Sequence, residues 1–302
     1  LNFCIQNGVK RFVSATSHRS TQGLWYQKKP IREEDGRSLK YSGQYSMFSI
    51  SESAAQDCIL HYTEEYGLRG IILRLPPVYG YGPHTEIFMD GKPIKTGFRI
   101  FIDNAKEHKP LQLWGNADIG RDVVYVKDVV AAFLQAIRKT DVCGIFNIAS
   151  GYKLSIREEA KIIADVFWEG NSDPVFIDLP EKENNIEEFV YDISKAKEEL
   201  EWTPLYSFKD MLLDTIEEQK KDKYHYLIEK RKIQLQKEKI WFHIDNIATY
   251  CIKNGNKVEV EVCENANMQL MKIYIMCSCL GFIMLQRDMV AIHGGVIEMD
   301  NN

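Results

Sequence analysis

The sequence predicts an α/β fold over residues 1–220, in which helices cover a parallel sheet, followed by a separate α+β tail. Between Val9 and Leu75 an apolar segment, a helical pattern and a second apolar segment follow one another within about 65 residues, the order of a parallel β-α-β unit. Beyond residue 240 the strict alternation of Lys257–Cys263 indicates a half-buried strand instead.

The N-terminal elements follow from apolar runs and the glycines that end them. Leu1–Gly8 looks like the last turns of a helix, so we expect the chain to be a fragment. Val9–Ser17 is typical of a buried strand that ends in small hydroxyl residues. Ser49–Tyr66 places apolar residues on one helical face, and Gly70–Leu75 is the next apolar strand. The loop Pro76–Pro83 leaves the carboxyl end of that strand, where ligands of open α/β sheets usually bind.

Further elements are expected up to about residue 220. Ser155 and Glu158 form the Ser-x-x-Glu pattern that begins a helix. The other expected helices are Gly97–Lys109, Asp128–Arg138, Ser194–Leu200 and Phe208–Glu218, and the other expected strands are Leu111–Trp114 and Gly144–Ala149. Residues 221–239 are rich in charge and are expected to form a solvated helix or a linker, which places a boundary between a domain of residues 1–220 and a tail of residues 240–302.

Composition excludes several classes of protein. The net charge of −5 argues against a general nucleic-acid binder. Seven cysteines without a Cys-x-x-Cys pair predict reduced thiols and a cytoplasmic location. The longest uncharged apolar stretch, Ile273–Leu285, has 13 residues and is shorter than the ~20 that a spanning helix needs, so no membrane is expected. The histidines lack ligand spacing, and no metal is assigned.

An ordered set of short motifs spans most of the first 220 residues. The set includes Asn7–Val13, Pro30–Asp35, Glu65–Leu68, Val78–Gly80, Gly120–Val126 with Asp128, Phe146–Ile148, Asp192–Ala196 and Trp202–Pro204. In order and spacing, this stretch resembles the NAD-dependent epimerase/dehydratase family, the extended short-chain dehydrogenases that act on nucleotide sugars. The resemblance implies a Rossmann-like doubly wound sheet, of which this chain has the C-terminal part, with a smaller substrate-binding subdomain.

The resemblance also implies a chemistry that this chain departs from. The family exchanges a hydride between a sugar carbon and a nicotinamide, with a Tyr as base and a Lys four residues later on the same helical face. Phe48 stands at the base position and Glu52 at the lysine position, which predicts impaired catalysis. Tyr45 is a substitute base if the helix start is remodelled. Ser17 matches the family's hydroxyl position or caps local backbone.

Cofactor and substrate residues are also assigned by this resemblance. NAD or NADP is the implied cofactor, and Pro76 is the residue that the resemblance assigns to cofactor binding. No Gly-rich dinucleotide loop occurs before Ser17, and about a hundred N-terminal residues of the family pattern are lacking, so dinucleotide binding in the family's manner is not expected. Arg121 matches the arginine that contacts the nucleotide diphosphate; the alternative is an ion pair with Asp122 or Asp118.

Two residues are candidates for the sugar pocket. Tyr79 and Pro77 would line it, although the residues around Tyr79 equally suit a turn. The resemblance further implies a homodimer formed through the helix Ser49–Tyr66.

The tail carries a second, weaker resemblance. Leu280–Asp300 is similar to the segment before the P-loop in HPr-kinase-like serine kinases, where His293 would lie near the nucleotide site or end a strand in a turn. The sequence stops at Asn302, before any Gly-x-x-x-x-Gly-Lys-Ser/Thr loop.

Three functions remain open from the sequence. The first is a nucleotide-sugar epimerase/dehydratase, the second a non-catalytic nucleotide-sugar binder or structural remnant, and the third a truncated HPr-kinase-like protein.

Overall fold

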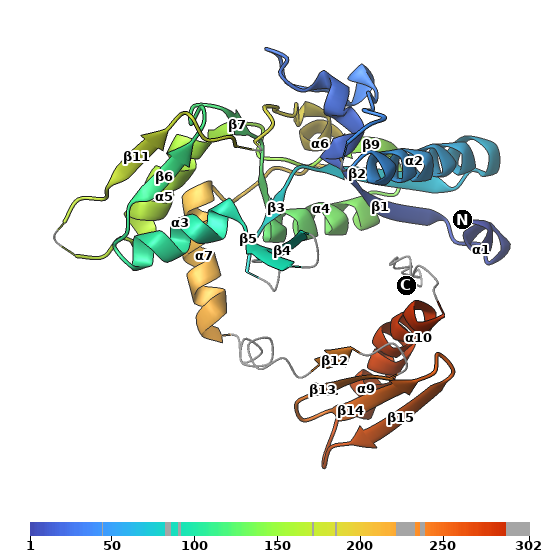
Figure 1. Cartoon of the computed structure of the whole chain (residues 1–302). Coiled ribbons are helices and arrows are strands. Elements are labelled where there is room, and N and C mark those ends of the chain that lie inside the picture. The colour runs from blue at the N-terminus through green and yellow to red at the C-terminus, as the bar shows by residue number, and fades with distance from the viewer. Residues whose placement is uncertain are drawn as a thin grey trace. The chain divides into compact units, whose positions relative to one another are not determined.

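A computed structural model shows two compact units, Leu1–Glu218 and Gln219–Asn302, which we describe separately (Figure 1). The residues that the structure describes are 1–43, 45–81, 86–89, 92–170, 172–184, 186–221, 233–235 and 239–287.

The first unit contains a three-stranded parallel sheet in the order β1-β2-β9. These strands are β1 (Arg11–Ser17), β2 (Arg69–Leu75) and β9 (Gly144–Asn147). The register places Ser17 beside Leu75, so β1 and β2 end at the same edge. This arrangement confirms the predicted parallel sheet. The short helix α1 (Asn2–Gln6) precedes β1, and the left-handed Gly8 (φ +70°) follows it.

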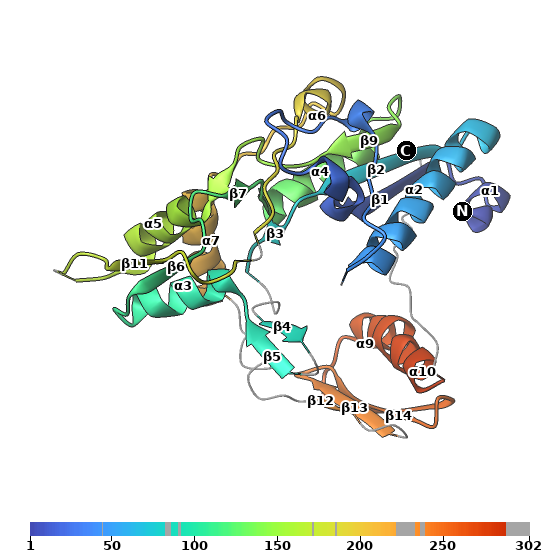
Figure 2. The same ribbon diagram turned by 45° about the horizontal axis from the view of Figure 1, so that its top comes forward.

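Two helices lie on opposite faces of this sheet (Figure 2). Successive side chains of a strand point to opposite faces. Ile71 and Leu73 of β2 pack in the same core as Val129 of α4 (Val126–Arg138). Gly70, which has the opposite orientation, lies so close to Ile59 of α2 (Ser46–Tyr66) that an added Cβ would sit 2.5 Å from its Cγ2. The two faces of β2 are therefore covered by different helices.

A smaller subdomain of the first unit surrounds a second parallel pair of strands. β6 (Leu111–Trp114) pairs with β11 (Phe176–Leu179). Helices α3 (Gly97–Lys106), α5 (Ile156–Phe167) and α7 (Phe208–Lys221) group around this pair (Figure 2) and share one hydrophobic core. The Ser155–Glu158 capping box begins α5 as predicted.

Short elements connect these layers. They are the 3₁₀ turns η1 (His18–Leu24) and η2 (Glu33–Asp35), the helix α6 (Ser194–Glu199), and the paired strands β3 (Val78–Tyr79) with β8 (Val124–Tyr125), β7 (Gly120–Arg121) with β10 (Leu154–Ser155), and β4 (Glu86–Met89) with β5 (Lys92–Lys95).

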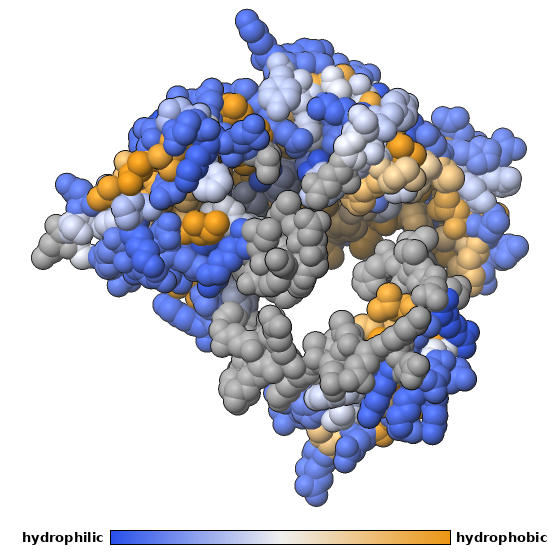
Figure 3. All heavy atoms as spheres, in the orientation of Figure 1, coloured by the Kyte–Doolittle hydropathy of each residue, from blue (hydrophilic) through white to orange (hydrophobic). Residues whose placement is uncertain are grey.

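One side of the first unit exposes apolar side chains. Val126, Val130 and Leu134 recur every four residues on α4 and are 37–53% exposed. Figure 3 shows apolar surface gathered over this part of the unit. Among the described residues, β1 is hydrogen-bonded along one edge, to β2.

The second unit is an antiparallel meander with a helix packed against it. Its strands are β12 (Ile233–Leu235), β13 (Lys239–Ile244), β14 (Ala248–Lys253) and β15 (Lys257–Val262). β15 matches the strand predicted from alternation. Most of the segment expected to be a charged helix or linker lies outside the described residues, and its described part includes β12, whose register pairs Ile233 with Phe242 and Leu235 with Ile240 of β13.

One helical stretch, Met268–Gln286, covers the sheet of this unit. It comprises α9 (Met268–Tyr274), the π-helical turn η3 (Ile275–Cys279) and α10 (Leu280–Gln286). Met271 and Cys279 are buried in the core with Tyr250, whose hydroxyl donates to the Met271 carbonyl at 3.1 Å. This stretch has a mean hydropathy of 1.7, and 11% of its residues are buried. Its length and composition match those of a helix that crosses a membrane, but the core helix of a soluble protein can have the same length and composition. The helix is longer than the uncharged run Ile273–Leu285 of the sequence, since it begins before the charged residue Lys272.

A buried carboxylate fastens three segments of the first unit together. Asp122 is fully buried and accepts hydrogen bonds from the backbone N–H groups of Ser150 (2.9 Å), Gly151 (3.1 Å) and Tyr191 (3.1 Å). The Ser150 hydroxyl donates to it at 2.5 Å. Burial raises the pKa of Asp122 to about 6, although these donors act in the opposite direction.

We expect Asp122→Asn to destabilise the chain by about 2–4 kcal/mol, because the amide that replaces one oxygen cannot accept from buried N–H groups. Urea unfolding followed by tryptophan fluorescence measures this change. Asp118→Asn is the matched control, since the Asp118 side chain is 74% exposed and its ion pair with Arg157 lies at the surface. Equal stability of the two variants would contradict the structural role of Asp122.

Candidate functional site

The candidate site lies where the loops leave the carboxyl ends of β1 and β2. Ser17 ends β1, and Pro76 and Pro77 follow β2 directly. Pro76 is buried, and the carbonyl of Pro77 accepts the N–H of Val124 at 3.1 Å. This contact joins the loop to β8 and leads the chain into β3, which carries Tyr79.

Ser17 acts as an N-cap. Its hydroxyl accepts the backbone N–H of Arg19 at 3.2 Å, and its carbonyl accepts the Ser20 hydroxyl at 3.1 Å. Both bonds satisfy the first turn of η1. Ser17 is half-buried at the end of β1. This position suits both predicted roles of its hydroxyl, the local cap and a contact to a ligand.

The first turns of α2 hold the residues at the expected base and lysine positions. Phe48 is 46% exposed and carries no ionisable proton. Glu52 accepts the Thr16 hydroxyl at 3.1 Å, and Thr16 in turn accepts from Gln56 at 2.8 Å. A carboxylate thus occupies the place beside the end of β1 where the family pattern has a cation. Phe48 and Glu52 do not supply the proton acceptor and the ammonium group that the nicotinamide chemistry uses.

Tyr45 precedes α2 and is 42% exposed. The guanidinium carbon of Arg19 lies 3.7 Å from the centre of its ring, a cation–π contact. This contact connects the start of α2 with the loop that follows β1.

An aromatic stack lies next to this loop. His18, Trp25 and Phe189 are stacked with ring centres 5.3–5.7 Å apart. Burial, with the nearby charges of Arg19 and Arg121, lowers the pKa of His18 to about 3. His18 is therefore a neutral member of this aromatic stack. Among the described residues no group of three or more His, Cys, Asp or Glu side chains is placed to hold a metal ion.

Arg121 lies at the centre of a polar cluster built from three elements. It stands on β7, which pairs with β10 and also bridges to Phe189. Its guanidinium hydrogen-bonds to the hydroxyl of Tyr79 on β3, and this hydroxyl donates to the carboxylate of Glu159 on α5. Burial disfavours the charge of Arg121, but Tyr79, Glu159 and Glu187 raise its pKa overall.

The predicted alternative for Arg121 is wrong. Asp118 pairs with Arg157 at 3.0 Å, and Asp122 accepts backbone N–H groups. Asp122 follows Arg121 directly in an extended segment, so the two side chains point to opposite sides. Arg121 is paired with Tyr79 and Glu159 instead.

Glu159 and Glu187 are site residues that the sequence did not reveal. Glu159 is 8% exposed on the buried face of α5, between Ile156 and Ala160. A carboxyl group on an otherwise apolar helical face was the available signal. Glu187 lies in an irregular segment, half-buried, 3.9 Å from Arg19, and carries no sequence pattern.

Gly120 allows the close approach that places Arg121. A Cβ at this position would lie 2.3 Å from the carbonyl oxygen of Leu154 on β10, so no other residue fits without moving the strand. The Gly120–Arg121 pair therefore holds β7 against β10, and α5 begins one residue after β10.

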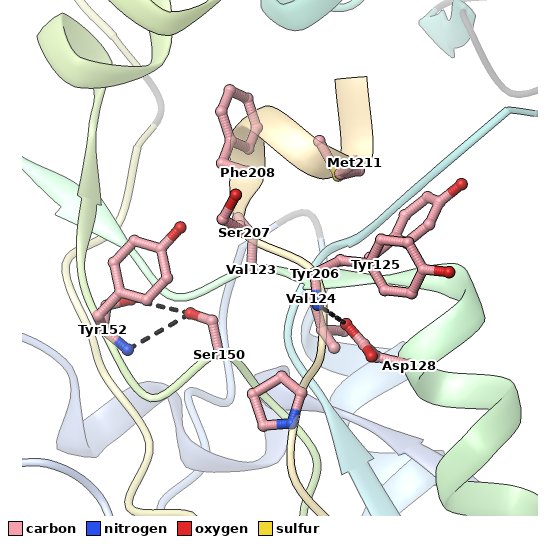
Figure 4. Close-up of a pocket in the computed structure, with 11 residues that line it drawn as sticks. Val123, Val124, Tyr125, Asp128, Ser150, Tyr152, Tyr206, Ser207, Phe208 and Met211 are labelled. Atoms are coloured by element: carbon pink, nitrogen blue, oxygen red, sulfur yellow. Dashed lines mark hydrogen bonds between the residues drawn. The ribbon is translucent and has the colours of Figure 1, made fainter. Parts of the chain in front are cut away.

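A small pocket lies elsewhere in the subdomain (Figure 4). Its polar groups already have partners within the protein: Asp128 accepts the N–H groups of Leu205 and Tyr206, and the Ser150 hydroxyl donates to Asp122. Figure 4 shows Tyr152 and Ser150 on one side and Asp128 on the other, without any member of the Arg121 cluster. We take the Arg121 cluster as the candidate site because it contains Arg121 and Tyr79, which the sequence predicts as substrate-binding residues, whereas this pocket contains neither.

Comparisons with known proteins identify a similar family, similar sequences and similar folds for the first part of the chain. Residues 1–149 match the family model of the NAD dependent epimerase/dehydratase family. The dTDP-4-dehydro-6-deoxyglucose reductase of Escherichia coli is 24% identical over 205 residues, which cover 68% of this chain and 60% of the reductase. The chain thus spans less than two thirds of this curated relative.

Solved structures of similar fold include two epimerases. The UDP-glucose 4-epimerase of Thermotoga maritima, solved with UDP-glucose, is 25% identical with a TM-score of 0.57, covering 73% of this chain and 66% of that one. The UDP-glucose 4-epimerase of Thermus thermophilus, solved as a complex with NAD, is 23% identical with a TM-score of 0.54, covering 72% and 66%. Both likenesses support the Rossmann-like α/β fold.

The family match ends before the tail. The similarity of residues 240–302 to HPr-kinase-like serine kinases stays a prediction, and His293 lies outside the described residues. Residues 1–149 are thus similar to the NAD dependent epimerase/dehydratase family, whose family model they match.

Proposed function

We propose that the chain binds a nucleotide sugar, with Arg121 holding the diphosphate. The observation that carries the proposal is a half-buried arginine, Arg121, whose strand bridges to the buried aromatic stack of His18, Trp25 and Phe189, next to the end of β1. A planar guanidinium suits bidentate contacts to phosphate oxygens. Tyr79 and Pro77 would line the sugar side, and Pro76 lies next to the cofactor side of the family pattern.

The same site argues against hydride transfer by this chain. Phe48 cannot accept a proton, and the carboxylate of Glu52 would repel the negative charge that develops on a phenol. The proposed activity is therefore binding without turnover, which is the second of the three functions that the sequence leaves open.

An enzymatic function with Tyr45 as the base is the second candidate. The cation–π contact from Arg19 favours it, because it holds the Tyr45 ring near the end of β1. In that case the chain would act as an NAD- or NADP-dependent epimerase or dehydratase.

Location and assembly are also proposals. The cysteines of the chain are all free, in keeping with a cytoplasmic location. A homodimer through α2 would cover Met47, Phe48 and Tyr66, which are 46–73% exposed.

We expect Arg121→Ala to weaken the binding of UDP-glucose or dTDP-glucose by about 10- to 100-fold, the loss of one charge-assisted contact to phosphate. Calorimetric titration of the full chain measures the affinity for each nucleotide sugar. Arg157→Ala is the control, since this arginine pairs with Asp118 and Asp178 at the surface. Arg121→Lys keeps the charge and checks that folding is retained. Absence of binding by the unaltered chain, or equal binding by Arg121→Ala, would contradict the proposal.

We expect UDP-glucose to stay unchanged when the chain is incubated with it and NAD, because Phe48 provides no base. Chromatography of the nucleotide sugar is the measurement, since an epimerase or dehydratase returns the hydride to the sugar and leaves no net reduced nicotinamide. A change of the nucleotide sugar that Tyr45→Phe abolishes would overturn binding without turnover and establish the enzymatic alternative.

A further inference from the structure

Glu159 carries a charge into a place built for apolar side chains. Ile156, Ala160 and Ile163 share its face of α5 and belong to the core of the subdomain. An ionised carboxylate at this depth is costly unless partners compensate it. Its partners come from two other elements, the Tyr79 hydroxyl and the Arg121 guanidinium.

The charges around Arg121 balance when every group is ionised. Arg121 faces Glu159 and Glu187, and Glu187 also lies 3.9 Å from Arg19. Two guanidinium groups thus meet two carboxylates, and Lys40 acts on Glu187 from outside this set. His18 and Tyr79 are neutral, since the pKa of His18 is lowered to about 3 and that of Tyr79 raised to about 12. A dianionic ligand would meet little net attraction in this state.

We propose that Glu159 is a positioning residue that couples the binding of a diphosphate at Arg121 to the uptake of one proton from solvent. This inference rests on the proposed function. With Glu159 ionised, the carboxylate holds the Tyr79 hydroxyl, which holds the guanidinium. When an anion arrives, a proton passes from hydronium or a buffer acid in the solvent to the Glu159 carboxylate: the donor's bond to hydrogen breaks, an O–H bond forms at Glu159, and the donor's conjugate base stays in solution. The neutral acid donates to the Tyr79 oxygen, and Arg121 directs its N–H groups to the anion.

The protonation equilibrium of Glu159 suits this role. Burial raises its pKa to about 7, while Arg121 and Tyr79 act in the opposite direction. A bound anion raises this pKa further, because like charges disfavour ionisation. Binding therefore takes up protons, and affinity falls as the pH rises above 7. A rise of one pKa unit on binding corresponds to about a tenfold loss of affinity across the titration.

The test is calorimetric titration of the full chain with UDP-glucose at about pH 7 and about pH 9, in buffers with different heats of protonation. The diphosphate of UDP-glucose does not titrate in this range, but the uracil N3–H begins to ionise near the higher pH, so a pH dependence is assigned to the protein only where sulfate, which does not titrate in this range, shows it too. Sulfate serves as a second anion without a nucleotide or sugar. The variants are Glu159→Gln, which removes the charge but keeps polar groups, and Glu198→Gln, the same change at an exposed position on α6.

We expect the unaltered chain and Glu198→Gln to take up about half a proton at pH 7, where Glu159 is already partly protonated, and to bind about fivefold more weakly at the higher pH. Glu159→Gln should bind without proton uptake and with the same affinity at both pH values. Retained pH dependence in Glu159→Gln would overturn the inference. If that variant does not fold, the unaltered chain decides, since binding without proton uptake also overturns it.

The experiment distinguishes a failure of nucleotide-sugar binding at Arg121 from a failure of the role of Glu159. Proton-coupled binding of sulfate that Arg121→Ala abolishes, without binding of UDP-glucose, would remove the proposed function and support the role of Glu159. Binding of UDP-glucose through Arg121 without proton uptake would leave the function and overturn the role of Glu159. Binding of neither anion would overturn both.

Discussion

The carboxylate of Asp122 is the contact on which the placement of the site depends. It gathers backbone N–H groups from the segment after β9 and from the segment that ends at Tyr191. Because Asp122 is fixed inside, the residue before it must point the other way. Arg121 is thereby directed toward Tyr79 and Glu159, so one buried interaction determines both the packing of the subdomain and the direction of the guanidinium.

The residue at which α5 begins determines that Glu159 faces Arg121. β10 pairs Leu154 with Arg121, and the capping box of Ser155 and Glu158 begins the helix at once. Glu159 then lies in the first turn, about 6 Å along the helix axis from the cap. Local sequence signals thus fix where the helix begins, and the geometry of the helix delivers the buried acid to the cluster.

Sequence patterns predicted the parallel sheet, the α2 helix and the cap of α5, because each rests on residues close together in the chain. Arg121 as the diphosphate contact stays a prediction, but the acidic partners considered for it, Asp118 and Asp122, are not the ones that lie beside it. The contact to Glu159 joins residues 38 positions apart on different elements, which no local pattern reports. β13 and β14 were likewise not predicted, because Trp241 and Cys251 put apolar residues on the more exposed face and make the sequence alternation less regular than in β15. β12 was missed because it is a short strand inside a charged stretch.

A crystal structure of the chain with UDP-glucose would show where the diphosphate binds. We expect diphosphate oxygens within hydrogen-bonding distance of the Arg121 guanidinium, with the sugar toward Tyr79 and Pro77. A diphosphate bound away from Arg121, for example in the pocket lined by Asp128 and Tyr152, would contradict this expectation.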